Sequence, residues 1–160
     1  MRRLLLVALA VGGLATAGAH AIVVQTGGYN GQIKGDPYPG SSISFKVKRT
    51  AAGKRRIVKF IASGMAYTCK GGMSGSTPAV SLERGFRVRK NRTFGGRADA
   101  VILGFDPPAR LKGKLRRRGR AVGTLRVFGE LDPQGQPGVH CDTGLQEWRA
   151  KKGPRQIVLP

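Results

Sequence analysis

Acidic residues are scarce in this chain. Its 160 residues include 8 Asp and Glu against 29 Lys and Arg, which gives a formal net charge of +21. A chain this basic should attract polyanions non-specifically and with strong salt dependence. Its 40% of hydrophobic residues still suffice for a core, so the composition indicates a folded protein.

Cysteine and histidine are nearly absent too. Two Cys are too few for a disulfide-rich miniprotein or a four-cysteine zinc site. His140 and Asp142 would share one face of a strand, but two ligands do not make a zinc site. We therefore expect no intrinsic metal ion and no cofactor.

The chain also lacks an apolar run of the roughly 20 residues that a membrane-spanning helix needs. The apolar run from Leu4 follows Arg2 and Arg3 and precedes Ala19-His20-Ala21, a small-residue pattern read by signal peptidase. This pattern predicts a secretory signal peptide over residues 1–21 and a single domain over residues 22–160. A membrane anchor is the alternative. Cleavage would remove two arginines, lower the charge to +19 and leave His140 as the only histidine.

A helical face of ten or more residues is missing as well. Apolar and polar residues instead alternate in Ile43–Lys48, which is typical of a half-buried strand. Glycines and prolines divide the chain into short runs, and we take Gly27-Gly28 and Gly95-Gly96 as breakers. The further strands expected are 56–61 (central), 86–89, 99–105, 111–117, 120–128 and 138–149, with a hairpin turn at Arg118-Gly119.

Eight to ten such strands predict an all-β fold, either a two-sheet β-sandwich or a jelly-roll-like arrangement. In residues 99–105, Val101, Leu103 and Phe105 would lie on one face and Ile102 on the other. The order strand, basic turn, strand, Cys occurs twice along the chain. This order indicates a weak internal duplication, although any β protein can show such an echo.

Cys69 and Cys141 both follow the signal peptide, and an even count in an exported chain favours a disulfide. The loop it would close corresponds to roughly 4 kcal/mol in the chain-entropy model. Two free buried thiols, or a nucleophilic Cys141 beside His140, are the alternatives. Trp148 has the parity of a core residue near Cys141, with a ligand-stacking role as its alternative.

Several segments resemble a known group of proteins. Leu111-Lys-Gly-Lys-Leu, Arg120-Ala-Val-Gly-Thr-Leu-Arg and Cys141-Asp-Thr-Gly are similar to the ending of small exported β proteins from high-GC Gram-positive bacteria. The start, with Gly28-Tyr-Asn-Gly and Ile43-Ser-Phe-Lys-Val, is similar as well. The resemblance implies export and an all-β fold, and it carries over no function and no catalytic residue. Independently of it, Gly123 and Gly144 suit a close backbone approach or a positive φ.

The cations are the remaining functional signal. Residues 112–120 hold six cations, and on a strand Lys112, Lys114, Arg116 and Arg118 would share the outward face. The candidate polyanion-binding residues are Lys112, Lys114, Arg116, Arg118, Arg120, Lys46, Lys48, Arg87 and Arg89. We expect a secreted or envelope-associated, non-catalytic binding module. Its partners would be anionic polymers of the envelope or extracellular matrix, without sequence-specific recognition of nucleic acid.

Two alternatives to this function stay open. Arg outnumbers Lys 18 to 11, which GC-rich codon usage would also produce, and the protein would then be a structural envelope component without a dedicated ligand. A small hydrolase would have to use His140. No Gly-x-Ser-x-Gly elbow and no paired carboxylates accompany that residue in the sequence, so we expect no enzyme.

Overall fold

The computed structural model describes residues 26–35, 40–103, 106–130 and 138–153. They form twelve strands and one short 3₁₀ turn, η1, so the all-β class is confirmed and the expected eight to ten strands are too few. The predicted signal peptide lies outside the described residues. The elements are β1 (Gly27–Ile33), β2 (Ser42–Arg49), β3 (Arg55–Ser63), β4 (Ala66–Cys69), β5 (Ser74–Ser76), β6 (Val80–Leu82), β7 (Phe86–Arg87), β8 (Thr93–Val101), β9 (Pro108–Leu115), η1 (Arg117–Gly119), β10 (Arg120–Glu130), β11 (His140–Asp142) and β12 (Gln146–Lys152).

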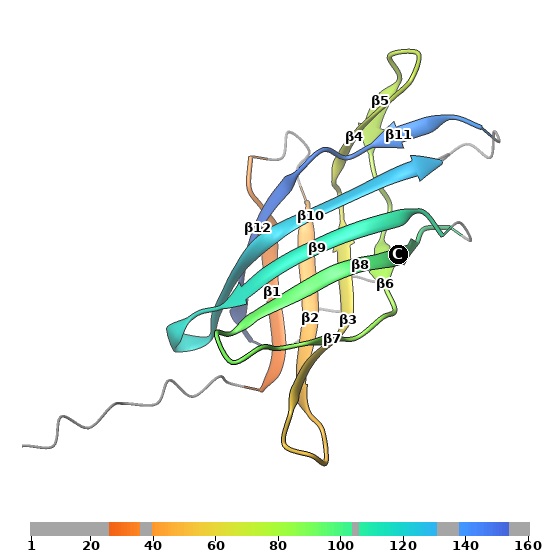
Figure 1. The fold of residues 1–160 in the computed structure, drawn as a ribbon. Coiled ribbons are helices and arrows are strands. Elements are labelled where there is room, and N and C mark those ends of the chain that lie inside the picture. Colours follow the sequence, from red (N-terminus) through yellow and green to blue (C-terminus); the bar gives the residue numbers. More distant parts are fainter. Residues whose placement is uncertain (1–25, 36–39, 104–105, 131–137, 154–160) are drawn as a thin grey trace, which may run out of the picture.

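Eight strands close into an antiparallel barrel (Figure 1). Their order is β12-β1-β2-β3-β6-β8-β9-β10, and Arg120–Leu125 of β10 pairs back with β12. The short strand β7 pairs with the start of β3. A two-sheet sandwich or jelly roll is not confirmed, because this pairing joins the two ends of the strand order into one ring.

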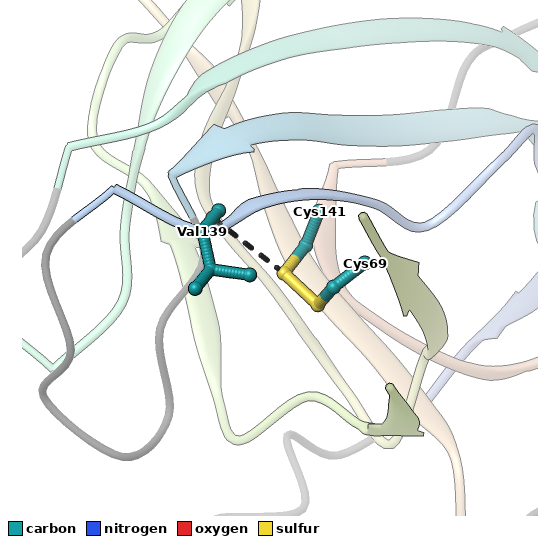
Figure 2. The surroundings of a disulfide bond; sticks show 3 residues. All are labelled: Cys69, Val139 and Cys141. Atoms are coloured by element: carbon teal, nitrogen blue, oxygen red, sulfur yellow. Dashed lines mark hydrogen bonds between the residues drawn. A yellow bond between two sulfur atoms is a disulfide. The ribbon is translucent and has the colours of Figure 1, made fainter. Parts of the chain in front are cut away.

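A small sheet branches from the barrel at the far end of β10. There β10 leaves β12 and pairs with β11, which pairs with β4, and β4 pairs with β5. Cys69 and Cys141 are direct partners across β4 and β11 and form a disulfide. Figure 2 shows this bond, with the Val139 carbonyl oxygen 3.8 Å from Sγ of Cys141. The predicted disulfide is confirmed, and the free-thiol and nucleophile alternatives are wrong.

Two buried threonines secure the places where strands pass from the barrel into the small sheet. Met65 lies between β3 and β4, and its N–H donates to Thr77 Oγ1 at 3.1 Å. Thr143 lies between β11 and β12, and its Oγ1 accepts the N–H of Val127 in β10 at 3.0 Å. Ladder pairing is interrupted at both places, so each hydroxyl replaces a missing strand partner.

The barrel interior is filled by aromatic rings. Phe45 lies among the others, with its ring centroid 4.9 Å from that of Tyr29, 5.6 Å from that of Phe60 and 5.8 Å from that of Trp148. Trp148 is only 2% exposed, which confirms its predicted place in the core. Burial also raises the pKa of Tyr29.

Two glycines make room for these rings. A Cβ on Gly123 would lie 2.4 Å from the Trp148 ring, and one on Gly113 would lie 2.2 Å from the Phe94 ring. These two glycines face each other across β9 and β10. Of the two alternatives predicted for both glycines, Gly123 shows the close approach and Gly144 the positive φ, which is 62°.

One bulge and two glycine pairs differ from the sequence prediction. Lys59 has a φ of 52°, and the β2–β3 register shifts beside it, so Ile57 and Phe60 both point inward although they are three residues apart. The glycine pairs that we took as breakers lie inside β1 and β8. Since glycine tolerates positive φ, the chain can bend at these pairs without leaving the sheet.

The end of β8 also differs from the prediction. Ile102 is buried, Val101 is half-buried, and Leu103 is 68% exposed with a φ of 47°. The burial of Val101 and Ile102 fits the opposite faces predicted for them, but β8 ends at Val101 and Leu103 lies in a turn. Phe105 lies outside the described residues. The expected strand over 138–149 is two strands, β11 and β12, separated by the turn at Gly144.

Candidate functional site: the basic end of the barrel

Three turns meet at the end of the barrel opposite the small sheet. They connect β2 to β3, β7 to β8, and β9 to β10. The β7–β8 turn is hydrogen-bonded to the ends of both other hairpins. The Val88 N–H donates to the carbonyl of Arg55, the first residue of β3, at 2.9 Å. The N–H of Leu115, the last residue of β9, donates to the Arg92 carbonyl at 3.0 Å. In Figure 1 the β2–β3 turn lies at the bottom, while the β4–β5 turn of the small sheet lies at the top.

Each of these turns carries several cations, and they surround two neighbouring depressions. The first has a volume of about 610 Å³, and its cations are Lys54, Arg55, Arg87, Arg89, Lys90, Arg92 and Lys114. The second has a volume of about 490 Å³, and it is lined by Arg92, Arg116, Arg117, Arg118 and Arg120. Arg92 belongs to both, so eleven cations form one continuous surface, which we call the basic end.

The basic end has no balancing carboxylate among the described residues. No Asp or Glu in the described ranges lines either depression. The two ion pairs in the described part of the chain lie elsewhere: Lys34 with Glu147, and Arg126 with Asp142. Within the first depression, Nε of Arg55 is buried without a hydrogen-bond partner in the described structure. The eleven cations therefore repel one another and depend on counterions from solution.

Three carboxylates lie toward the small sheet. Glu130 and Asp142 belong to β10 and β11, and Asp106 lies in the connection between β8 and β9. The Nε–H of Arg126 is shared between Oδ1 and Oδ2 of Asp142, at 3.0 and 3.1 Å, and Nη2 of Arg126 also donates to Oδ2. The hydrogen bonds from Arg126 lower the pKa of Asp142, with help from the Gly144 N–H, against the opposing effect of burial.

Six of the nine predicted polyanion-binding residues line the basic end: Lys114, Arg116, Arg118, Arg120, Arg87 and Arg89. Lys46, Lys48 and Lys112 are exposed on the outer wall of β2 and β9, and they line neither depression. The outward direction predicted for Lys112 and Lys114 holds, since Leu111, Gly113 and Leu115 are buried between them.

One part of the prediction for β9 was wrong. The strand ends at Leu115, so Arg116 and Arg118 do not share a strand face with Lys112 and Lys114. The hairpin turn does lie at Arg118-Gly119, where φ is 57° and 65° in succession. Consecutive positive φ values match the twist of an antiparallel hairpin, and they turn the arginines toward the end of the barrel.

Sequence reasoning left five basic-end residues out of the candidate site: Lys54, Arg55, Lys90, Arg92 and Arg117. A local signal existed, because Arg87 to Arg92 contains four cations in six residues. What the sequence could not reveal is that this run lies between two other basic turns, since that depends on the direction in which each strand runs.

His140, the residue that a hydrolase would have to use, lies in the small sheet and not at the basic end. His140 is exposed on β11, and its backbone carbonyl accepts the Lys70 N–H at 2.8 Å. Asp142, two residues further, is bound by Arg126 and not by this histidine. No group of three or more His, Cys, Asp or Glu within the described ranges is placed to hold a metal ion. In the same ranges, no helix has the length and apolar character needed to cross a membrane.

Comparison with known proteins adds no relative: no family model, no curated protein and no solved structure matches the chain.

Proposed function

We propose that the protein is an exported, non-catalytic binding module that holds linear polyanions at the basic end of its barrel. One observation carries this proposal: eleven cations from three turns and their flanking strands surround two depressions that no described carboxylate lines. A polymer with many negative charges would replace the counterions that these cations hold, and the release of those ions would favour binding entropically.

The disulfide supports the location. Disulfides form and persist in oxidising compartments outside the cytosol, and Cys69–Cys141 joins two strands of the small sheet. Together with the sequence pattern of residues 1–21, it favours secretion or association with the cell envelope. Anionic wall polymers and acidic polysaccharides are the polyanions that such a protein would meet.

The test compares two triple charge reversals in the full chain. Lys90→Glu, Arg117→Glu and Arg118→Glu act at the basic end, where all three side chains are exposed. Lys70→Glu, Arg84→Glu and Arg97→Glu change the net charge equally, at exposed positions away from that end. Retention on heparin and on isolated cell walls is measured as the salt concentration needed for elution, after circular dichroism has shown that each variant is folded.

We expect the basic-end variant to elute at much lower salt and the matched control to shift far less. Equal shifts would mean that only net charge matters, and they would favour a structural envelope component without a dedicated ligand. Retention of the wild type no stronger than that of an unrelated protein of equal charge would also overturn the proposal.

A further inference from the structure

Among the described residues, only arginines line the second depression of the basic end. Its five arginines come from three parts of the chain: Arg92 from the β7–β8 turn, residues 116–118 from the β9–β10 turn, and Arg120 from the first position of β10. Guanidinium groups that surround a depression of about 490 Å³ from several directions present many N–H donors to whatever enters it.

The backbone under these arginines is fixed. Arg116 donates its N–H to the Arg120 carbonyl at 2.7 Å, and Leu115 donates to the Arg92 carbonyl, so the two turns are bonded to each other. In the β7–β8 turn, Asn91 Oδ1 accepts both the N–H and the hydroxyl of Thr93, at 3.1 and 2.7 Å. The arginines therefore extend from a rigid frame, which reduces the entropy that binding would cost.

Two of these arginines hold an unfavourable backbone conformation. Arg92 has a φ of 68° and Arg118 a φ of 57°, and the described chain has only two other non-glycine residues with positive φ, Lys59 and Leu103. A left-handed conformation is unfavourable for an L-residue that carries a Cβ, and glycine or asparagine would avoid most of this cost. Such strain is typical of positions where a particular side chain is needed for function.

We propose that this depression, which we call the arginine site, binds one tetrahedral oxyanion group, a phosphate or a sulfate, carried by the polyanion. The inference rests on the proposed function and names the chemical group that the site selects. A carboxylate has two oxygens in one plane and is satisfied by one or two guanidinium forks. A tetrahedral group directs its oxygens to several sides, and it can accept forks from arginines that approach from different segments.

The test preserves charge and changes only the shape of the donor. Arg92→Lys, Arg116→Lys and Arg118→Lys are combined in the full chain, because lysine is a point charge that lacks the bidentate fork. Arg84→Lys, Arg97→Lys and Arg110→Lys form the matched control, since these arginines lie on exposed positions outside the arginine site. The probes are polyphosphate, dextran sulfate and polygalacturonate of equal length, titrated at physiological salt.

We expect the wild type and the control to prefer the phosphate or the sulfate polymer over the carboxylate polymer. The arginine-site variant should lose about tenfold in affinity for the preferred polymer and little for polygalacturonate. The polymer that shows the loss identifies phosphate or sulfate as the recognised group.

Two results would overturn the inference: no preference in the wild type, or a preference that survives in the lysine variant. Both are distinct from a failure of the proposed function. If charge reversal at the basic end abolishes binding while the lysine variant binds as the wild type does, the binding function stands and the arginine site does not.

Discussion

The two ends of the barrel differ in how their charged and polar groups are satisfied. At the small sheet, a disulfide joins β4 to β11, Asp142 is paired with Arg126, and Thr77 and Thr143 complete the backbone pairing. At the basic end, eleven cations have no carboxylate of the described residues beside them, and two arginines hold a left-handed backbone. One end therefore contributes stability, whereas the other lowers it through clustered like charges and backbone strain.

Removal of the disulfide should affect the small-sheet end most. In Cys69→Ser combined with Cys141→Ser, we expect the free energy of unfolding to fall by about 2–4 kcal/mol, because the unfolded chain is no longer cross-linked over a separation of 72 residues. Thermal and denaturant unfolding measure this loss. Polyanion binding below the melting temperature should remain at the wild-type level, and a large loss of binding would show that the two ends are not independent.

Replacement of the buried hydroxyl in Thr143→Val should cost about 1–3 kcal/mol, since the Val127 N–H then loses its acceptor. Urea unfolding measures the loss, and hydrogen exchange should show weaker protection of the Val127 amide. Thr143→Ser keeps the hydroxyl and serves as the control. If Thr143→Val and Thr143→Ser were equally stable, the hydroxyl would not be what secures the junction between β11 and β12.

At the basic end, by contrast, we expect a substitution to raise the free energy of unfolding. Arg118→Asn should raise the free energy of unfolding by about 1 kcal/mol, because Asn-Gly suits two consecutive positive φ values and one clustered charge is removed. Arg117→Asn removes the same charge without relieving a positive φ, so it should stabilise less. Urea unfolding and polyphosphate titration are measured together. Stabilisation accompanied by weaker binding supports the contrast between the ends, whereas a destabilised Arg118→Asn contradicts it.

The smallest effect concerns pH at the small sheet. The pKa of Asp142 is lowered in the folded protein, so its contribution to stability is present at neutral pH and is lost as the pH falls through that lowered pKa. Asp142→Asn should therefore melt slightly below the wild type at pH 7, and the two should converge in acid. Glu130→Gln, on the same sheet, is the control. A difference that persists undiminished in acid would assign the effect to packing.

The sequence predicted best what depends on near neighbours. Alternation over Ile43–Lys48 located β2, and inward parity located Trp148 in the core. The bulge at Lys59 was missed because it breaks the period of two on which that reasoning depends. The glycine pairs of β1 and β8 were taken as breakers, although strand pairing continues through both of them. Closure of the ring was missed as well, since β10 pairs with β12 through contacts that no local pattern encodes.

The candidate site was predicted in part for the same reason. The run from Lys112 to Arg120 is visible in the sequence. It supplies Lys114 to the first depression and four of the five arginines to the arginine site. Arg92 comes from a different turn, and its place in the site depends on the bond between its carbonyl and the Leu115 N–H. The charge of the basic end is a property of the composition, but its concentration at one end is a property of the topology.

The rings of Tyr29, Phe45, Phe60, Phe94 and Trp148 have a consequence for how the protein can meet a ligand. An eight-stranded barrel is just wide enough either to be filled by its own side chains or to enclose one small molecule. Here the side chains take that space, so this barrel is a solid support rather than a carrier with cargo in its lumen. Under the proposed function, a long polymer would therefore lie along the turns and the outer wall without having to enter the protein.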